Sequence, residues 1–168
     1  MNVKAMTAAA LTGVLRPLLQ TVNMVSAPEV AKERGIVIED VRREQHGAYE
    51  NYIRLTVITE RQERSVAGTV FGDQKPRIIQ IKGINMEAEL GENMLYVTNE
   101  DKPGFIGQLG SILGDAKINI ATFNLGRKVE GEEAICLVEI DGEISEESVN
   151  EIAAIEQVKQ AKLLHFPQ

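Results

Sequence analysis

The sequence contains no tryptophan and only 4% aromatic residues, although 43% of its 168 residues are hydrophobic. Its core is therefore expected to consist of aliphatic and β-branched side chains. The single cysteine, Cys136, cannot form an intrachain disulfide, and we expect it to be a small buried hydrophobic residue. This cysteine usage is typical of a reducing compartment and predicts a cytoplasmic protein. No apolar run approaches the ~20 residues that span a bilayer, so no membrane contact is expected.

Recognisable catalytic and metal-binding patterns are also missing from the sequence. The two histidines, His46 and His165, have no nucleophile at a suggestive spacing, and no metal-ligand quartet is present. Residues 1–90 carry 12 Lys and Arg against 11 Asp and Glu, whereas residues 91–168 carry 6 against 14. The resulting net charges of +1 and −8 make up the total of −7. This asymmetry indicates two modules, and the acidic one is a poor ligand for nucleic acid, which needs clustered Lys and Arg.

Hydrophobic periodicity predicts an α+β fold class with two small modules. The first module, residues 1–90, is expected to pack two helices on a mainly antiparallel sheet. Its helices are expected at residues 5–21 and 27–34, and its strands at 36–46, 53–57, 66–70, 79–81 and 84–90. The boundary is expected at Gly91-Glu92-Asn93.

The second module, residues 91–168, follows the ferredoxin-like order βαββαβ. Its elements are expected at residues 94–99, 104–116, 119–128, 132–140, 145–156 and 158–165. Such a module covers one face of its sheet with helices and leaves the other face and the sheet edges for a partner.

The most informative segment runs from Asn99 to Ile106, where a polar turn ends in Pro103-Gly104 and opens a helix. A helix N-terminus presents unpaired N–H groups and partial positive charge, which suit a carboxylate. We expect the amides from Gly104 through Phe105 to Ile106 to fill that role, while Asp101 suits an ammonium group. A free amino acid carries both groups, so the pattern predicts a binding site rather than a catalytic one.

Each polar residue of this segment also has a structural interpretation. Asp101 could simply cap the helix, and Asn99 and Asn119 could tie down turns. Four glycines at spacings of three and four along the helix indicate either tight packing or room for a ligand or second chain; they are Gly104, Gly107, Gly110 and Gly114. Asn119 follows the far end of the helix, so we expect it to reach the site from a symmetry-related chain. This favours a pocket between subunits.

Basic residues enrich the first module, and two interpretations remain open. They form either a solvated strand face or a weak site for a phosphate or carboxylate. Glu87, Glu89 and Glu92 argue against the anion site. The basic residues are Arg42, Arg43, Arg54, Arg61, Arg64, Lys75, Arg77 and Lys82, together with His46.

Two groups of motifs resemble known families. Asn99-x-Asp101-Lys102-Pro103-Gly104 with Ile118-Asn119-Ile120 resembles the ACT domain, a small-ligand regulatory module of amino-acid metabolism. The segments 22–28 (Val-Asn-Met-Val-Ser-Ala-Pro) and 31–36 (Ala-Lys-Glu-Arg-Gly-Ile) resemble the intervening, or allosteric substrate-binding, domain of long-form D-3-phosphoglycerate dehydrogenases. Nearly the whole chain, from about Thr7 to Leu164, is therefore similar to the carboxyl-terminal half of that family.

The resemblance implies a non-catalytic regulatory fragment with no cofactor of its own. L-serine would be its effector, with the family's serine contacts falling on Asn99, Asp101 and Asn119, and sheet pairing would form a homodimer or tetramer. The parent enzyme would be an NAD-dependent oxidoreductase that oxidises 3-phosphoglycerate at the first step of L-serine biosynthesis and undergoes feedback inhibition. Its catalytic and NAD-binding domains would precede Met1. Ile84 and Asn85 occupy the place where some relatives carry basic residues, which argues against phosphate binding by the first module.

Two alternatives stay open. The chain could be an ACT-containing subunit of an L-serine dehydratase, which would need a partner with an iron–sulfur cluster. It could also be an assembly module whose ligand pocket is vestigial.

Overall fold

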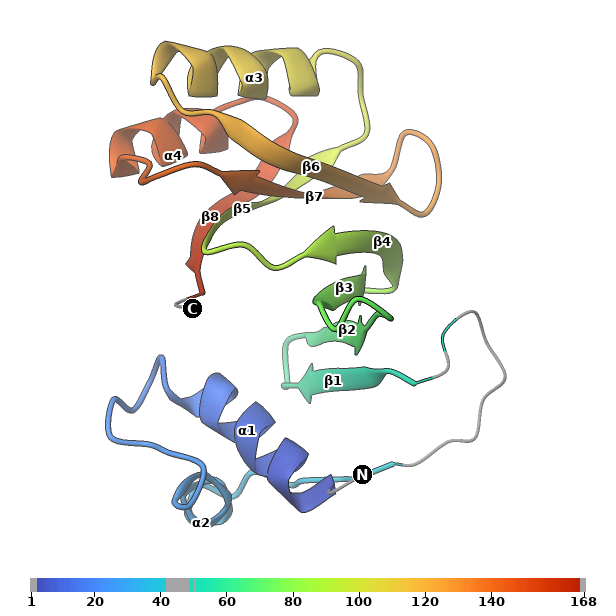
Figure 1. The fold of residues 1–168 in the computed structure, drawn as a ribbon, viewed down its shortest axis with the longest axis vertical. Coiled ribbons are helices and arrows are strands. Elements are labelled where there is room, and N and C mark those ends of the chain that lie inside the picture. Colours follow the sequence, from blue (N-terminus) through green and yellow to red (C-terminus); the bar gives the residue numbers. More distant parts are fainter. Residues whose placement is uncertain (1–2, 42–48, 50, 167–168) are drawn as a thin grey trace. The chain divides into compact units, whose positions relative to one another are not determined.

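The computed structural model describes residues 3–41, 49 and 51–166, which fall into a first compact unit up to residue 48 and a second from Tyr49 onward. The first unit is a helix pair, α1 (Val3–Leu15) and α2 (Ala27–Glu33) (Figure 1). Its small core consists of Leu15, Val22, Ala27 and Ala31, flanked by Leu11, Leu19 and Val30. Both predicted helices are present. Helix α1 ends at Leu15 rather than at residue 21, because Pro17 lacks a backbone N–H and disfavours helix at the preceding residue.

The strand predicted over residues 36–46 is not found in the part that the structure describes. Residues 36–41 have no ladder partner there, and residues 42–46 lie outside the described residues. Val37 and Val41 are exposed instead of half buried. Alternating hydrophobicity fits a strand, but a strand also needs a hydrogen-bonded neighbour, which periodicity does not supply.

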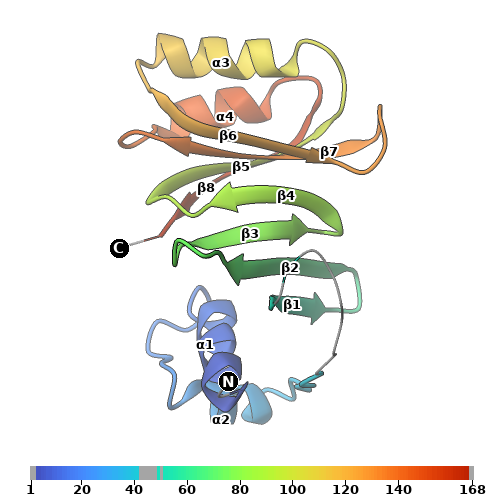
Figure 2. The same ribbon diagram turned by 45° about the vertical axis from the view of Figure 1, so that its right-hand side comes forward.

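The second unit contains two four-stranded antiparallel sheets (Figure 2). The first sheet is a meander in the order β1-β2-β3-β4, and the second has the order β6-β7-β5-β8. The strands are β1 (Ile53–Ile58), β2 (Glu63–Val70), β3 (Pro76–Ile81), β4 (Ile84–Glu89), β5 (Asn93–Glu100), β6 (Ile120–Arg127), β7 (Glu133–Ile140) and β8 (Val158–His165). Helices α3 (Phe105–Asp115) and α4 (Glu146–Ala153) cover one face of the second sheet. This confirms the α+β fold class and the βαββαβ order.

The helices hold the second sheet through an apolar layer. Phe105, Leu109 and Leu113 recur every four residues along α3, so they lie on one face of the helix and are buried against the sheet. On the sheet side this core includes Leu95, Val97, Cys136 and Val138. Burial raises the pKa of the Cys136 thiol to about 12. The free cysteine is thus an inert core residue, as its sequence context predicts.

The opposite face of the second sheet packs against strand β4. Ile84, Met86 and Ala88 alternate along β4 and are all buried. They form one cluster with Met94, Ile135 and Leu137 of the second sheet. The first sheet therefore supplies the partner for this face. The predicted boundary near Gly91 falls in the link between β4 and β5, within the second compact unit.

No helix in the described part of the chain combines the length and apolar character needed to cross a bilayer.

Candidate functional site

The turn between β5 and α3 carries most of the predicted site. Gly104 is the residue before the first helical position of α3, and its φ of +98° lies in the left-handed region that favours glycine. Because no side chain caps this helix end, the first amides of α3 lack the usual side-chain acceptor. Phe105 is buried in the core, whereas Ile106 is 54% exposed. The helix end thus has backbone N–H groups without a side-chain cap, next to the exposed side chain of Ile106.

Asn99 ends a buried stretch of β5 and has an unsatisfied oxygen. The residue is 2% exposed, its Nδ2 donates to the carbonyl oxygen of Glu100 at 2.8 Å, and its Oδ1 has no partner. A buried acceptor without a partner costs free energy, so it marks either strain or a place for a donor from a ligand.

A second unsatisfied oxygen belongs to the same strand end. Gln157 precedes β8, its carbonyl accepts the N–H of Glu100 at 2.8 Å, and its buried Oε1 has no partner. In the ladder between β5 and β8, Asn99 lies opposite Val158, the residue that follows Gln157. Two acceptors therefore belong to neighbouring backbone positions where β5 ends, and both lack a donor.

Asp101 already holds a cation. Its Oδ2 accepts from Arg127 Nη1 at 2.5 Å and from the N–H of Gly131 at 3.3 Å. Its own N–H donates to the carbonyl of Glu132 at 2.8 Å. The hydrogen bond from Arg127 is the main cause that lowers the pKa of Asp101, so the carboxylate is ionised at neutral pH. These hydrogen bonds of Asp101 connect the β6–β7 hairpin to the turn between β5 and α3.

Asn119 lies away from this cluster. It is exposed, and its Nδ2 donates to Asp141 Oδ2 at 2.6 Å. Arg127, which contacts Asp101, is eight residues further along the extended β6, which corresponds to roughly 26 Å. One chain therefore brings together Asn99, Asp101 and the start of α3, but it does not bring Asn119 to them.

Three contributors to this cluster were missed by sequence reasoning, namely Arg127, Gly131 and Gln157. Their only sequence signal is that each lies where a predicted strand or turn meets the end of β5. The register of β6 on β7 decides that Arg127 points toward Asp101, and register cannot be read from one strand alone.

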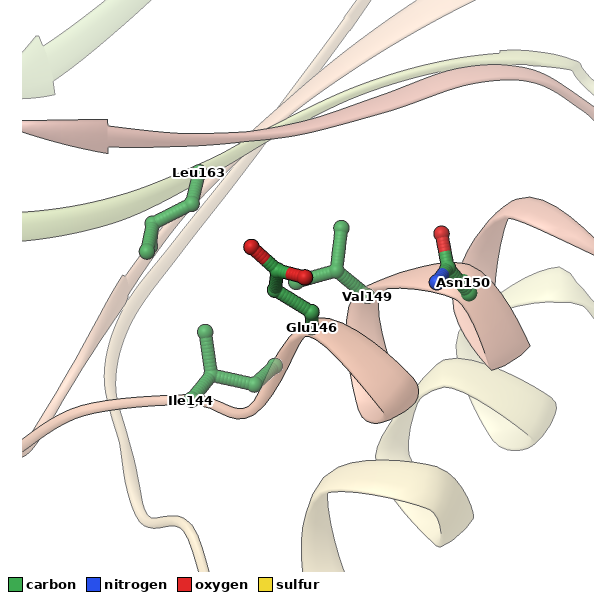
Figure 3. A pocket seen from close by; sticks show the side chains of 5 residues that line it. All are labelled: Ile144, Glu146, Val149, Asn150 and Leu163. Atoms are coloured by element: carbon green, nitrogen blue, oxygen red, sulfur yellow. The ribbon is translucent and has the colours of Figure 1, made fainter.

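Two surface hollows lie elsewhere in the second unit. One, of about 250 Å³, is formed by α4, the loop before it and β8. Figure 3 shows its Glu146 side chain between Ile144 and Leu163. The other, of about 260 Å³, is lined by Leu55, Val57, Arg64, Ser65, Val66, Ile81, Lys82 and Tyr96. Neither contains a residue of the predicted amino-acid site, although the second includes Arg64 and Lys82, two of the basic residues considered for an anion site.

Several basic residues of the first sheet are held in ion pairs. Lys82 pairs with Glu133, and Arg77 bridges Asp73 and Glu89 at 2.6 Å each. These contacts favour structural roles for both cations over the anion site. No cluster of three potential metal ligands is found among the described residues.

The comparisons with known proteins agree across the chain. Residues 1–82 match the D-3-phosphoglycerate dehydrogenase intervening domain, and residues 93–157 match the ACT domain. The D-3-phosphoglycerate dehydrogenase of Bacillus subtilis is 36% identical over 162 residues, which cover 96% of this chain and 31% of the relative. The enzyme of the same name from Methanocaldococcus jannaschii is 33% identical, with 93% of this chain and 30% of the relative covered. The chain thus spans about a third of the length of these curated relatives. These matches give no support to the dehydratase alternative.

Proposed function

Because this chain belongs to the D-3-phosphoglycerate dehydrogenase family, of which it forms the regulatory part with the intervening and ACT domains, we propose that it binds L-serine and relays that binding to the catalytic domains. The observation that carries the proposal is the strand end of β5. There, an ionised carboxylate, two acceptors without donors and an uncapped helix N-terminus belong to neighbouring backbone positions. This set matches a small zwitterion.

The binding mode follows from the charges. The ammonium group of the amino acid would contact Asp101 and donate to Asn99 Oδ1, which lacks a donor. The carboxylate would accept from the amides between Gly104 and Ile106, where the helix macrodipole is positive. Both contacts are charge-assisted hydrogen bonds, which are stronger than neutral ones.

A second copy of the chain would complete the site. Strand β6 is an edge strand, with a ladder partner on one side only in the described part of the chain. If two β6 strands pair antiparallel about a two-fold axis at Phe123, residue 119 of one strand lies opposite residue 127 of the other. Since Arg127 contacts Asp101, this pairing would bring the partner's Asn119 to the Asp101 cluster. A homodimer, or a tetramer built from it, would therefore bind serine across its interface.

The parent enzyme would use NAD to oxidise 3-phosphoglycerate in the cytoplasm, with serine as its feedback inhibitor. Since the chain matches only about 30% of the length of these relatives, we assign NAD binding and catalysis of the parent enzyme to the rest of that length.

Calorimetric titration of the chain with L-serine tests the proposal, with D-serine and glycine as comparison ligands. We expect saturable binding of L-serine that is abolished in Asp101→Ala. The matched control is Asp115→Ala, which removes an exposed carboxylate from the other end of α3 and should leave binding unchanged. Absence of serine binding to the unmodified chain, or unchanged affinity in Asp101→Ala, would contradict the proposal and favour the assembly module with a vestigial pocket.

A further inference from the structure

Arg127 forms an ion pair with the carboxylate of Asp101, which the ammonium group of the proposed effector requires. Its Nη1 lies 2.5 Å from Asp101 Oδ2, and the Asp101 side chain is only 15% exposed. The N–H of Gly131, from the hairpin that follows Arg127, donates to the same oxygen. An ammonium group that approaches Oδ2 must therefore displace the guanidinium group.

The guanidinium group of Arg127 can be displaced from Asp101. The Arg127 side chain is 51% exposed, so water can replace the contact that it makes with Asp101. Because the arginine side of the pair is half exposed, solvent screens part of the attraction, and ordering the long arginine side chain costs entropy. A compact ammonium with three donors can make the same contact and has donors left for a second acceptor, and the unpaired Oδ1 of Asn99 belongs to a residue only two positions before Asp101. The geometry therefore sets two cations in competition for one carboxylate.

We propose that the guanidinium group of Arg127 competes with the ammonium group of the amino-acid effector for the carboxylate of Asp101. Arg127 would thereby set the affinity for the effector. The inference rests on the proposed function, because it names the residue that tunes binding at the same site. Arg127 is the last residue of β6, the edge strand that would pair with a second copy. Displacing it would leave the hairpin at residues 128–132 bound to Asp101 only through the N–H of Gly131 and the carbonyl of Glu132. Effector binding would thereby be coupled to the strand on which the subunits pair.

The test compares three variants of the chain by calorimetric titration with L-serine. Arg127→Gln removes the competing charge, and we expect it to bind L-serine about two- to fivefold more tightly, the range that a weak ion pair allows. Arg127→Lys should fall between Arg127→Gln and the unmodified chain, since it keeps the charge without the planar fork. The matched control, Lys128→Gln, removes the same charge from the neighbouring residue and should change the affinity less than twofold. Thermal melting of each variant verifies that it is folded.

Ethanolamine, which has the ammonium and hydroxyl groups of serine but no carboxylate, separates the roles that Arg127 could play. A competitor for the ammonium predicts the same gain for both ligands in Arg127→Gln. Weaker serine binding with unchanged ethanolamine binding would overturn the inference and make Arg127 a carboxylate receptor. Unchanged affinity in Arg127→Gln, with serine still bound by the unmodified chain, would overturn the inference alone. If neither protein binds serine, the proposed function fails as well.

Discussion

Gly126 on β6 lies directly against the main-chain oxygen of Asn85 on β4. A Cβ atom added to Gly126 would stand 2.5 Å from that oxygen and 2.8 Å from Ile84 Cγ2. Glycine is therefore required where the first sheet packs onto the second. Arg127 follows immediately along the chain, so the same strand is held by β4 at one residue and by Asp101 at the next.

Gly126→Ala should destabilise the chain by about 1–3 kcal/mol, because the new methyl group must push apart two backbones that are fixed in different sheets. Chemical denaturation measures the change in the free energy of unfolding. Gly107→Ala is the matched control: it lies inside α3 with nothing within 4 Å of the added Cβ, and it should stabilise the chain by about 0.8–1 kcal/mol. Equal effects of the two substitutions would show that the close approach at Gly126 does not affect the free energy of unfolding.

The ion pair of Asp101 predicts a pH dependence of stability. Arg127 lowers the pKa of Asp101 below its ordinary value of 3.8, so the folded chain binds this proton less tightly than the unfolded chain. The resulting stabilisation is present above the unfolded pKa and is lost as the pH falls through the lowered folded pKa. Asp101→Asn should therefore lose less stability than the unmodified chain between pH 7 and acidic pH. Denaturation of both proteins across this range measures the difference, and parallel curves would exclude the contribution.

The second module could be predicted from the sequence almost element by element. The helix expected at 104–116 is found at Phe105–Asp115, and the strand expected at 132–140 is found at Glu133–Ile140. Both patterns are local: apolar residues at helical spacing, or an apolar run bounded by turns, suffice to identify them. Asn99 and Asp101 could be identified for the same reason, since they adjoin a Pro-Gly turn that opens a helix.

The non-local contacts could not be predicted in this way. Met86 and Ile135 belong to one buried cluster that joins the two sheets, although the two residues are about fifty positions apart in sequence. The contact between Arg127 and Asp101 depends on how β6 is registered against β7, and a shift of one residue would turn Arg127 to the other face. The segment 36–41 shows the converse, because its alternation predicts a strand that has no ladder partner among the described residues.

Gln157 offers a test in which stability and binding respond in opposite directions. Its buried Oε1 has no partner, so Gln157→Met removes an unsatisfied acceptor while keeping a side chain of similar length. We expect the free energy of unfolding of the empty chain to stay level or rise by up to about 1 kcal/mol. If the effector donates to this oxygen, the same substitution should weaken L-serine binding. Denaturation and calorimetry on one preparation measure both quantities, and a loss of stability would show that Oε1 is satisfied in solution.

A site shared between subunits predicts complementation between two inactive variants. Asp101→Ala removes the ammonium partner from one chain, and Asn119→Ala removes the contribution of the other, so each variant alone should fail to bind L-serine. Mixed and allowed to exchange subunits, equal amounts should give about half mixed dimers, each with one intact and one doubly defective site. The mixture should then bind serine at about one quarter of the wild-type number of sites, with unchanged affinity at each. Because Asn119 and Arg127, which contacts Asp101, are separated by roughly 26 Å along β6 of one chain, no site contained in a single chain can produce this recovery. Binding that is lost in Asp101→Ala but retained in Asn119→Ala would instead locate the whole site in one subunit.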